Sequence, residues 1–302
     1  MIQEDGCMRM RFENETGTGQ IRAYEVFPGI LLSYSDFRLE RCESTYARSQ
    51  NMFGFECCLE GKIQWDRQDG QSAFLGAGSL MPYDYEQSSG RFLFPQRNYR
   101  GISFGIQPQK AAGQLPEQFP VDLEQLKARF HWGNNLDLSH SPQAVRILGL
   151  IQEAEHQTDL HRKLACLELL LFLQDLKWSE APAVPLYLPS AQVQKLRQAV
   201  GLILEHLDHQ YTLQELSEAV HIPVTTLRRQ FSGIYGCSAA QFARKHRIEE
   251  AQRLLRETEL NTSQIAARLG YDNPSKFAAV FRAETRMAPQ EYRSMIHEQN
   301  GA

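Results

Sequence analysis

The feature that most constrains this chain is an internal repeat in its last third. Segments 213–222 and 262–271 align 49 positions apart, and after a one-residue insertion the match continues at a spacing of 50. The aligned pairs are Leu216 and Ile265, Ser217 and Ala266, Val220 and Leu269, Leu227 and Phe277, and Phe231 and Phe281. A period of this length predicts two tandem copies of one helical unit.

Each copy has the pattern of a helix-turn-helix unit. A short helix carries a small residue where its partner crosses, a tight turn follows at His221 or Gly270, and a second helix has two apolar anchors four residues apart. Residues 212–215 (TLQE) and 238–241 (SAAQ) predict capping boxes. Asn-Pro at 273–274 predicts a capped helix start.

A long amphipathic helix is predicted between the copies, over residues 238–258. A helix of ~20 residues spans about 30 Å, and successive major grooves on one face of B-DNA lie about 34 Å apart. One chain could therefore place two helices in adjacent grooves. A helical bundle with a duplicated motif and no role in DNA binding is the alternative.

The rest of the chain predicts a second domain of another class. Residues 179–190 hold three prolines, which predicts an extended linker between a domain at 1–178 and one at 191–302. Over about 20–110 the pattern favours a β-sandwich or a small β-barrel, and over about 121–178 it favours helices. Strands are predicted at 52–59, 61–67, 71–75, 79–85, 91–94 and 99–106, with a hairpin turn at Asp69-Gly70, and helices at 122–130, 142–157 and 160–178.

Charge and motif content exclude most enzyme classes. Residues 1–189 hold 18 Lys and Arg against 24 Asp and Glu, a net charge of −6, whereas residues 190–302 hold 14 against 12, a net charge of +2. A basic C-terminal part is compatible with a polyanionic partner. No histidine precedes His131, and no Gly-rich phosphate loop, G-x-S-x-G or H-E-x-x-H motif occurs. We therefore predict no metal site, no cofactor and no enzyme.

The localisation prediction comes from the cysteines and from the N-terminal sequence. The six cysteines include no C-x-x-C pair, and the first residues, MIQEDGCMRMRF, lack the apolar core of a signal peptide. No apolar run is long enough to cross a membrane. A cytoplasmic protein with reduced thiols and no membrane partner is predicted.

The repeat also carries a family resemblance. Ser263–Arg293 resembles the signature of the AraC/XylS transcription regulators, I-A-x-x-x-G-[FY]-x-x-x-S-x-F-x-x-x-F-[KR] followed by x-P-x-x-[FY]-R, and Arg247–Leu255 resembles their linker helix, R-[LIM]-x-x-A-x-x-L-L. The likeness covers roughly residues 192–295. By layout, the N-terminal part is similar to the family's cupin-like sensor and dimerisation domains. Leu164–Leu173 and the segment LEGKIQWDR resemble the siderophore-responsive branch, without naming a ligand.

The resemblance implies which side chains meet DNA. In the family, the exposed face of each second helix enters the major groove, and the matching positions here are Thr225, Thr226, Arg228 and Arg229 in the first copy and Ser275, Lys276 and Ala279 in the second. Arg229 is the best candidate for reading a guanine, whereas Ala279 can touch only a thymine methyl. Arg282, Lys245 and Arg244 are candidate phosphate partners.

Aromatic residues predict a ligand pocket in the barrel. The candidates are Phe53, Phe55, Trp65, Tyr83, Tyr85 and Tyr99, although each of them is also a plausible core residue. Leu160, Leu164, Leu167 and Leu171 recur at helical spacing, and burial within the monomer or in a dimer seam would explain them equally well.

The predicted fold is thus α+β in two domains, a cupin-like β-barrel with a helical dimerisation segment and an all-helical tandem helix-turn-helix domain. The predicted function is a sequence-specific, small-molecule-responsive transcription activator that binds double-stranded DNA as a homodimer and contacts RNA polymerase. The alternative is a constitutive DNA binder whose barrel recognises a protein partner.

Overall fold

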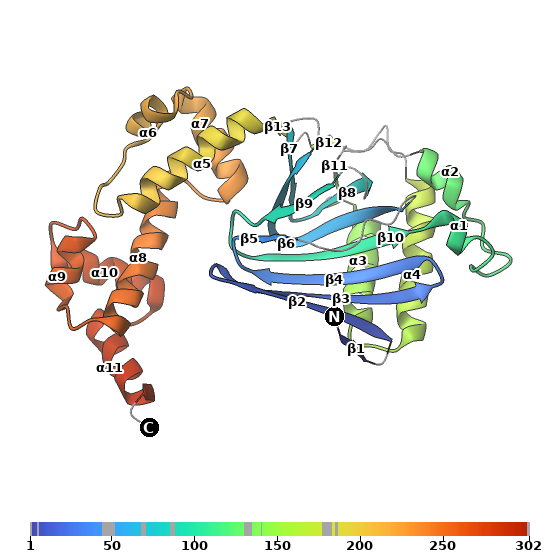
Figure 1. The fold of residues 1–302 in the computed structure, drawn as a ribbon, viewed down its shortest axis with the longest axis horizontal. Helices are drawn as coiled ribbons and strands as arrows, with labels where there is room; N and C mark the ends of the chain where they lie inside the picture. Colours follow the sequence, from blue (N-terminus) through green and yellow to red (C-terminus); the bar gives the residue numbers. More distant parts are fainter. Residues whose placement is uncertain are drawn as a thin grey trace. The chain divides into compact units, whose positions relative to one another are not determined.

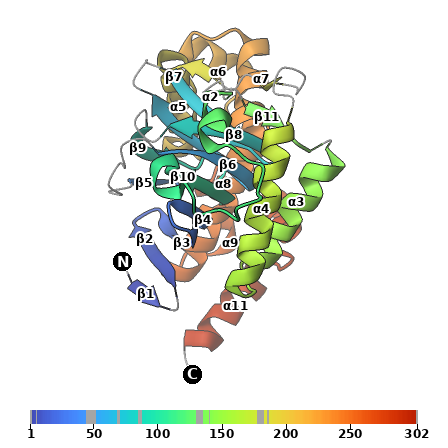
Figure 2. The ribbon, with the colours of Figure 1, turned by 90° about the vertical axis from the view of Figure 1, so that its right-hand side faces the viewer.

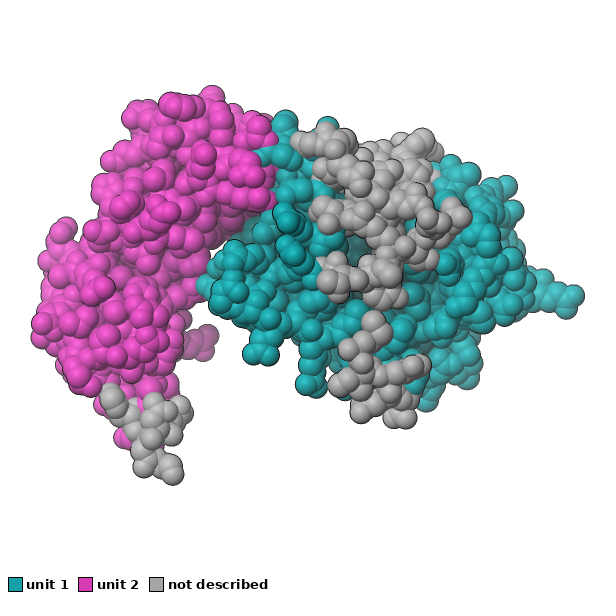
Figure 3. All heavy atoms as spheres, in the orientation of Figure 1, with its two compact units in different colours: residues 1–190 teal, residues 191–302 magenta. Residues whose placement is uncertain are grey.

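The computed structural model describes residues 2–4, 6–43, 52–67, 71–84, 88–129, 135–139, 141–176, 183–184 and 187–300. The chain divides into two compact units, residues 1–190 and residues 191–302 (Figure 3). The predicted turn at Asp69-Gly70, the candidate Tyr85 and residues 179–182 and 185–186 of the predicted linker lie outside the described residues. Along the described part of the chain, no helix combines the length and the apolar composition that a membrane crossing requires.

The first unit is built on antiparallel strands (Figure 1). They are β1 (Ile2–Glu4), β2 (Cys7–Asn14), β3 (Gly17–Phe27), β4 (Ile30–Arg38), β5 (Arg41–Glu43), β6 (Phe53–Arg67), β7 (Gln71–Gly76), β8 (Ser79–Asp84), β9 (Ser88–Leu93), β10 (Tyr99–Ile106), β11 (Asn135–Asp137), β12 (Ala183–Val184) and β13 (Tyr187–Pro189). The order along the main path is β1-β2-β3-β4-β10-β6-β8-β11-β12. Pairings among the described residues do not close this path into a ring, so the structure shows an antiparallel sheet domain.

Strand β6 corrects one prediction. Two strands, 52–59 and 61–67, were expected, but β6 is a single strand of 15 residues. It bends at Gly61, which has a φ of +78° and where a Cβ would lie 2.0 Å from the carbonyl oxygen of Asn98. Before the bend β6 pairs with β10 and β8, and after it with β7 and β9. The glycine therefore lets one continuous strand take part in two sheets.

Strands β1 to β5 were missed by the prediction of strands from the sequence. They cover most of residues 2–43, and their register is continuous from β2 through β3 to β4. In β2 the side chains of Arg9, Arg11 and Glu13 are exposed while the intervening ones are at least half-buried, which is the period-two pattern of a strand with one solvated face. The Pro28-Gly29 pair, which forms the turn between β3 and β4, was a turn signal that could have been recognised in the sequence.

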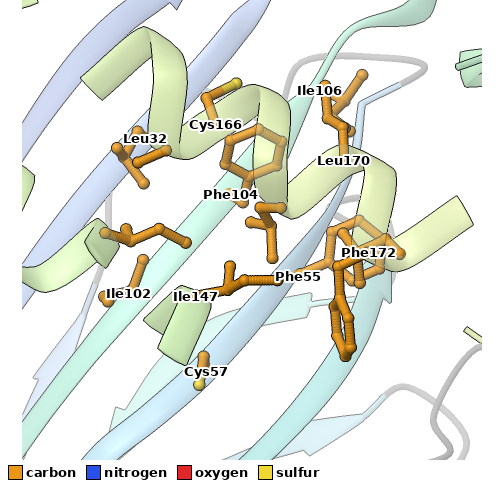
Figure 4. Packing of buried hydrophobic residues seen from close by; sticks show 14 of the residues in the cluster. Leu32, Phe55, Cys57, Ile102, Phe104, Ile106, Ile147, Cys166, Leu170 and Phe172 are labelled. Atoms are coloured by element: carbon orange, nitrogen blue, oxygen red, sulfur yellow. The ribbon is translucent and has the colours of Figure 1, made fainter. Parts of the chain in front are cut away.

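Four helices accompany the sheet: α1 (Pro108–Ala111), α2 (Leu123–Ala128), α3 (Pro142–Ala154) and α4 (Asp159–Asp175). Helices α3 and α4 lie side by side along one face of the sheet (Figure 2). Phe55, Ile102 and Phe104 project from the strands into the same core as Ile147 of α3 and Leu170 of α4 (Figure 4). Burying each such side chain stabilises the fold by about 1.5–3 kcal/mol.

Polar contacts join the C-terminal end of α3 and the N-terminal end of α4 to the sheet. The hydroxyl of Tyr34 donates to the carbonyl oxygen of Ile151 at 2.7 Å, and Arg22 pairs with Glu155 at 2.6 Å. The guanidinium of Arg162 lies 4.2 Å from the ring centre of Tyr24. These contacts join the α3–α4 hairpin to strands β3 and β4.

The second unit is all-helical among its described residues. Its helices are α5 (Ser190–Glu205), α6 (Leu213–Val220), α7 (Val224–Tyr235), α8 (Ala239–Glu257), α9 (Thr262–Arg268), α10 (Pro274–Thr285) and α11 (Pro289–Asn300). Helices α6 and α7 form the first helix-turn-helix, α9 and α10 form the second, and α8 runs between them (Figure 1). The tandem helix-turn-helix prediction is confirmed.

Local signals explain why these helices start and end where they do. The predicted capping boxes of α6 and α8 are both present, and a third, between Asn261 and Gln264, opens α9. Asn273 caps α10 through the amide of Ser275 at 2.8 Å, as predicted. The turns at His221 and Gly270 both have positive φ, which ends the first helix of each copy.

Two arginine contacts repeat with the units, one from the buried Arg247 and one from the half-buried Arg293. Arg247 donates to the carbonyl oxygens of Leu207 and His209, at 2.6 and 2.8 Å. Arg293 donates to the carbonyl oxygens of Leu255, Thr258 and Leu260, at 2.6–3.3 Å. Each guanidinium therefore satisfies the carbonyls that precede a helix-turn-helix unit and ties them to the helix that follows it.

Candidate nucleic-acid interface

The first helix-turn-helix holds its second helix by a small number of buried contacts. Leu227 and Phe231 of α7 are 0% and 1% exposed, and Phe231 packs edge-on against Phe242 of α8. Ser217 of α6 donates through its hydroxyl to the carbonyl oxygen of Ile222 at 2.6 Å, which fixes the turn between the helices. These contacts fix the orientation of α7 through its buried side, and the opposite side of the helix is open to solvent.

The predicted side chains of α7 lie on that opposite side. Thr225, Arg228 and Arg229 are exposed, and Thr226 is half-buried. Next to them, Gln230 is held by a hydrogen bond from Gln192 of α5 at 2.8 Å. The exposed face of α7 therefore presents two guanidinium groups and one hydroxyl.

The second helix-turn-helix has the same construction. Phe277 and Phe281 of α10 are both fully buried, and Phe281 packs edge-on against Tyr292 of α11. The predicted positions on the outward side are all exposed, and they are Ser275, Lys276, Ala279 and Arg282. This face carries fewer donors than that of α7, because Ala279 has none.

Ion pairing separates the cations of this unit into two groups. Within the described residues, Arg228, Arg229, Lys245, Lys276 and Arg282 form no ion pair and no side-chain hydrogen bond. Arg253, in contrast, pairs with both Glu250 and Glu257, at 2.7 and 2.6 Å. The unpaired charges lie on the second helices and the first half of α8, which is the electrostatic pattern of a polyanion-binding face.

Arg244 differs from the other predicted phosphate partners. It is exposed, but its Nε lies 3.6 Å from a carboxylate oxygen of Glu284 and so bridges α8 and α10. Arg268, which was not predicted, is exposed at the end of α9 and has no ion pair in the described part of the chain. In the alignment of the two copies, Arg268 corresponds to Ala219. A cation present in only one copy was therefore the sequence signal that could have identified Arg268.

The predicted ligand-pocket residues do not come together on one surface. Phe53 and Phe55 are fully buried on the helix-covered face of the sheet. Trp65, Tyr83 and Tyr99 belong to the cluster on the other face, which we call the inner face. The adjacent cysteines of β6 divide in the same way, Cys57 to the helix-covered face and Cys58 to the inner face, so both pack rather than chelate, as predicted. In the described part of the chain, no group of His, Cys, Asp and Glu could hold a metal ion.

A polar groove of about 270 Å³ lies beside the end of α3. It is lined by Arg22, Arg38 and Arg100 together with Asp36, Glu60 and Glu155, and by smaller or uncharged residues. Three cations face three carboxylates in it. The groove therefore has no net charge from these side chains and no pronounced preference for an anion or a cation.

Comparisons with known proteins match both units. Residues 18–171 match the family described as "Regulatory protein PchR N-terminal domain", and residues 216–295 match the family described as "Helix-turn-helix domain". The HTH-type transcriptional regulator YisR of Bacillus subtilis is 29% identical over 109 residues, covering 36% of this chain and 38% of YisR. The HTH-type transcriptional activator RhaR of an Enterobacter strain is 32% identical over 107 residues, covering 35% of this chain and 38% of RhaR. The chain thus spans less than two thirds of the length of these relatives.

Two solved structures are also similar. The DNA-binding domain of AdpA, crystallised in complex with a target DNA, is 27% identical and covers 35% of this chain and 95% of that one, with a TM-score of 0.34. ToxT from Vibrio cholerae is 12% identical and covers 89% of this chain and 98% of that one, with a TM-score of 0.31. The PchR match alone extends over 154 of the 302 residues. The chain therefore belongs to the AraC family of helix-turn-helix transcription regulators and carries a PchR-type N-terminal domain.

Proposed function

We propose that this protein is a transcription activator that binds two adjacent major grooves with α7 and α10 and responds to a small molecule bound by residues 1–178. The observation that carries the DNA-binding part is the set of unpaired, exposed cations on α7, α10 and the start of α8. Membership of a non-enzymatic family agrees with the prediction that the chain is not an enzyme.

The length of the helix between the two copies supports two-groove binding. Helix α8 has 19 residues, which corresponds to a length of about 28 Å. This approaches the distance of about 34 Å between successive major grooves on one face of B-DNA. Because α8 is capped at both ends and packs against both copies, it acts as a rigid spacer.

The chemistry of the exposed side chains assigns different roles to the two copies. A guanidinium can donate two parallel hydrogen bonds to O6 and N7 of guanine, so Arg229 is the base reader of α7, assisted by Thr225. Ala279 leaves α10 without a donor at the corresponding position, so Lys276, Arg282 and Lys245 bind phosphates. Sequence specificity therefore depends mainly on the first copy.

Replacing Arg229 by alanine tests this assignment. We expect binding to the preferred duplex to weaken by about 1–3 kcal/mol and base preference to be lost at one position. The preferred duplex would first be recovered by selection from random sequences, and affinities measured by fluorescence anisotropy. Arg253→Ala is the matched control, since that guanidinium is already held by two carboxylates. An Arg229→Ala variant with an unchanged base profile would refute the role.

An exposed leucine stripe on α4 supports a homodimer. Leu160, Leu164 and Leu171 are 63%, 57% and 36% exposed, and Val145 of α3 is 54% exposed. A contiguous apolar stripe of this kind is unfavourable in water and marks an interaction surface. We assign it to a second copy of the chain, because residues four and seven apart on one helix match the seam of a helix pair.

Leu164→Glu should abolish this dimer. The new carboxylate would face its symmetry mate in an apolar seam, and we expect the dimer dissociation constant to rise by roughly 100-fold or more. The measurement is analytical ultracentrifugation over a concentration series, with Gln157→Glu as a control that adds the same charge outside the stripe. Retention of the dimer by Leu164→Glu would assign the stripe to another partner, such as the protein partner of the alternative function.

Regulation by a small molecule and activation of transcription complete the proposal. The relatives named RhaR and RhaS are described as transcriptional activators, which supports activation. A contact with RNA polymerase and a cytoplasmic location are further parts of the proposal. An effector acts only through a difference in affinity between two states of the protein. A cupin-like closure of the sheet around that effector is part of the proposal.

A further inference from the structure

The inner face of the central strands is lined by unusually small residues. In β4, β10 and β6 the register pairs Ser33 with Ser103, Ser35 with Gly101, Ser103 with Glu56, and Gly105 with Gly54. The only large ionisable side chain among these residues is that of Glu56. The single carboxylate of Glu56 therefore lies among serine and glycine residues on this face.

Hydroxyl groups hold this carboxylate in place. Tyr99 donates to one carboxylate oxygen of Glu56 and Ser103 donates to the other. Gly101 makes the first bond possible, because a Cβ at that position would lie 2.2 Å from the hydroxyl oxygen of Tyr99. Both oxygens keep further lone pairs for a ligand.

Within the described part of the chain, no cation compensates Glu56. Among the described residues, its only side-chain partners are the two hydroxyls, and burial raises the pKa of Glu56 despite them. A carboxylate that is largely removed from water without a counter-charge is costly. Glu56 and Ser103 nevertheless keep part of their surface accessible to solvent, so a ligand group can reach them.

Aromatic rings lie on the same face of the sheet as the carboxylate. The inner-face cluster includes Phe37, Phe94 and Tyr99 at its centre, with Trp65 and Tyr83 half-buried at its margin. The rings of Phe37 and Phe94 stack at a centroid distance of 4.7 Å. Because Phe37, Phe94 and Tyr99 are buried, the ring surface open to a ligand on this face comes from Trp65 and Tyr83. Ring surface on the same face as a carboxylate matches a ligand that has an apolar or aromatic body and a positive group, because ring faces also attract cations.

We propose that the inner face binds a small organic amine with an aromatic or apolar body, and that Glu56, positioned by Tyr99 and Ser103, accepts hydrogen bonds from its ammonium group. This inference rests on the proposed function, because it names the chemical class of the effector. The ligand would supply the counter-charge that the described residues do not provide at this position.

The test uses the full chain and three matched probes: 2-phenylethylamine, 2-phenylethanol and phenylacetate. Isothermal titration calorimetry should show the amine binding at least about 10-fold more tightly than the alcohol, and the acid not binding. Glu56→Gln should remove the advantage of the amine, since it keeps the shape and removes the charge. Glu60→Gln, an exposed glutamate on the same strand, should keep that advantage.

Parallel measurements separate this inference from the proposed function. Binding of each variant to a duplex at low salt reports whether the DNA-binding unit works, and circular dichroism reports whether Glu56→Gln folds. Ser103→Ala, which removes one donor to the carboxylate, provides a milder variant and should change amine affinity without changing duplex binding. Equal affinity for amine and alcohol, tighter binding of the acid, or undiminished amine binding by Glu56→Gln would overturn the inference and leave DNA binding intact.

Discussion

Replacing Phe281 by alanine should destabilise the second helix-turn-helix by about 3–5 kcal/mol. Phe281 is fully buried, lies 5.8 Å from the ring of Phe277 and 5.6 Å from that of Tyr292, and joins α10 to α11. Its removal leaves a cavity that neighbouring aromatic rings cannot fill without moving. The loss approaches the whole stability of a small domain, so α9 to α11 should open.

Hydrogen exchange followed by mass spectrometry gives the local readout. We expect amides of α9, α10 and α11 to lose most of their protection in Phe281→Ala, and those of the sheet in residues 1–190 to keep theirs. Met287→Ala, at a side chain 37% exposed, is the control and should change stability by less than about 1 kcal/mol. Full protection of α10 in Phe281→Ala would contradict the core described for this unit.

DNA binding should weaken steeply as salt rises. Four of the unpaired cations, Arg228, Lys245, Lys276 and Arg282, are available for phosphates once Arg229 is assigned to a base. Each phosphate contact contributes a slope of about −0.9 in log affinity against log salt, so raising salt from about 50 to about 200 mM should cost on the order of 100-fold per protomer.

Single substitutions measure how much each cation contributes to the slope of log affinity against log salt. Lys245→Ala should reduce it by about one, whereas Arg253→Ala should leave it unchanged, because Arg253 is neutralised by Glu250 and Glu257. Fluorescence anisotropy with a labelled duplex at several salt concentrations provides the slopes. A decline of less than about fivefold over that range would show that these cations do not contact phosphates.

The helical unit was predictable because its signals are local. The capping boxes at Thr212 and Ser238, the positive-φ turns at His221 and Gly270 and the length of α8 all follow from residues within a few positions of each other. The repeat doubled each of these signals. The predicted start and end of α8 agree with the structure to one residue.

The sheet was less predictable because its contacts are distant in sequence. Whether β6 continues through Gly61 depends on Asn98, whose carbonyl oxygen lies where a side chain would be. The faces of Phe55 and Tyr99 depend on a register shift between β10 and β6 near Arg100 and Gly101. Alternation within one strand does not reveal which side the helices cover.

The positions that we propose to face DNA were predictable from the sequence, but the ion pairs of their side chains were not. Exposure of Thr225, Arg229 and Lys276 follows from helical periodicity once Phe231 and Phe277 are placed in the core. That Arg244 is paired with Glu284 requires α8 and α10 to be placed in space. Likewise, the surroundings of the Glu56 carboxylate, two hydroxyl groups and no cation among the described residues, can be known only once its neighbours on β10 are placed.

Selection of binding sites from random duplexes by the intact protein tests the central claim most directly. If α7 and α10 enter successive major grooves, the recovered sequences should contain two short boxes about 10 base pairs apart per protomer, with stronger base preference in one of them. The more strongly preferred box should lose one position when Arg229→Ala is used instead. Recovery of a single box, or of no preferred sequence at all, would contradict the account.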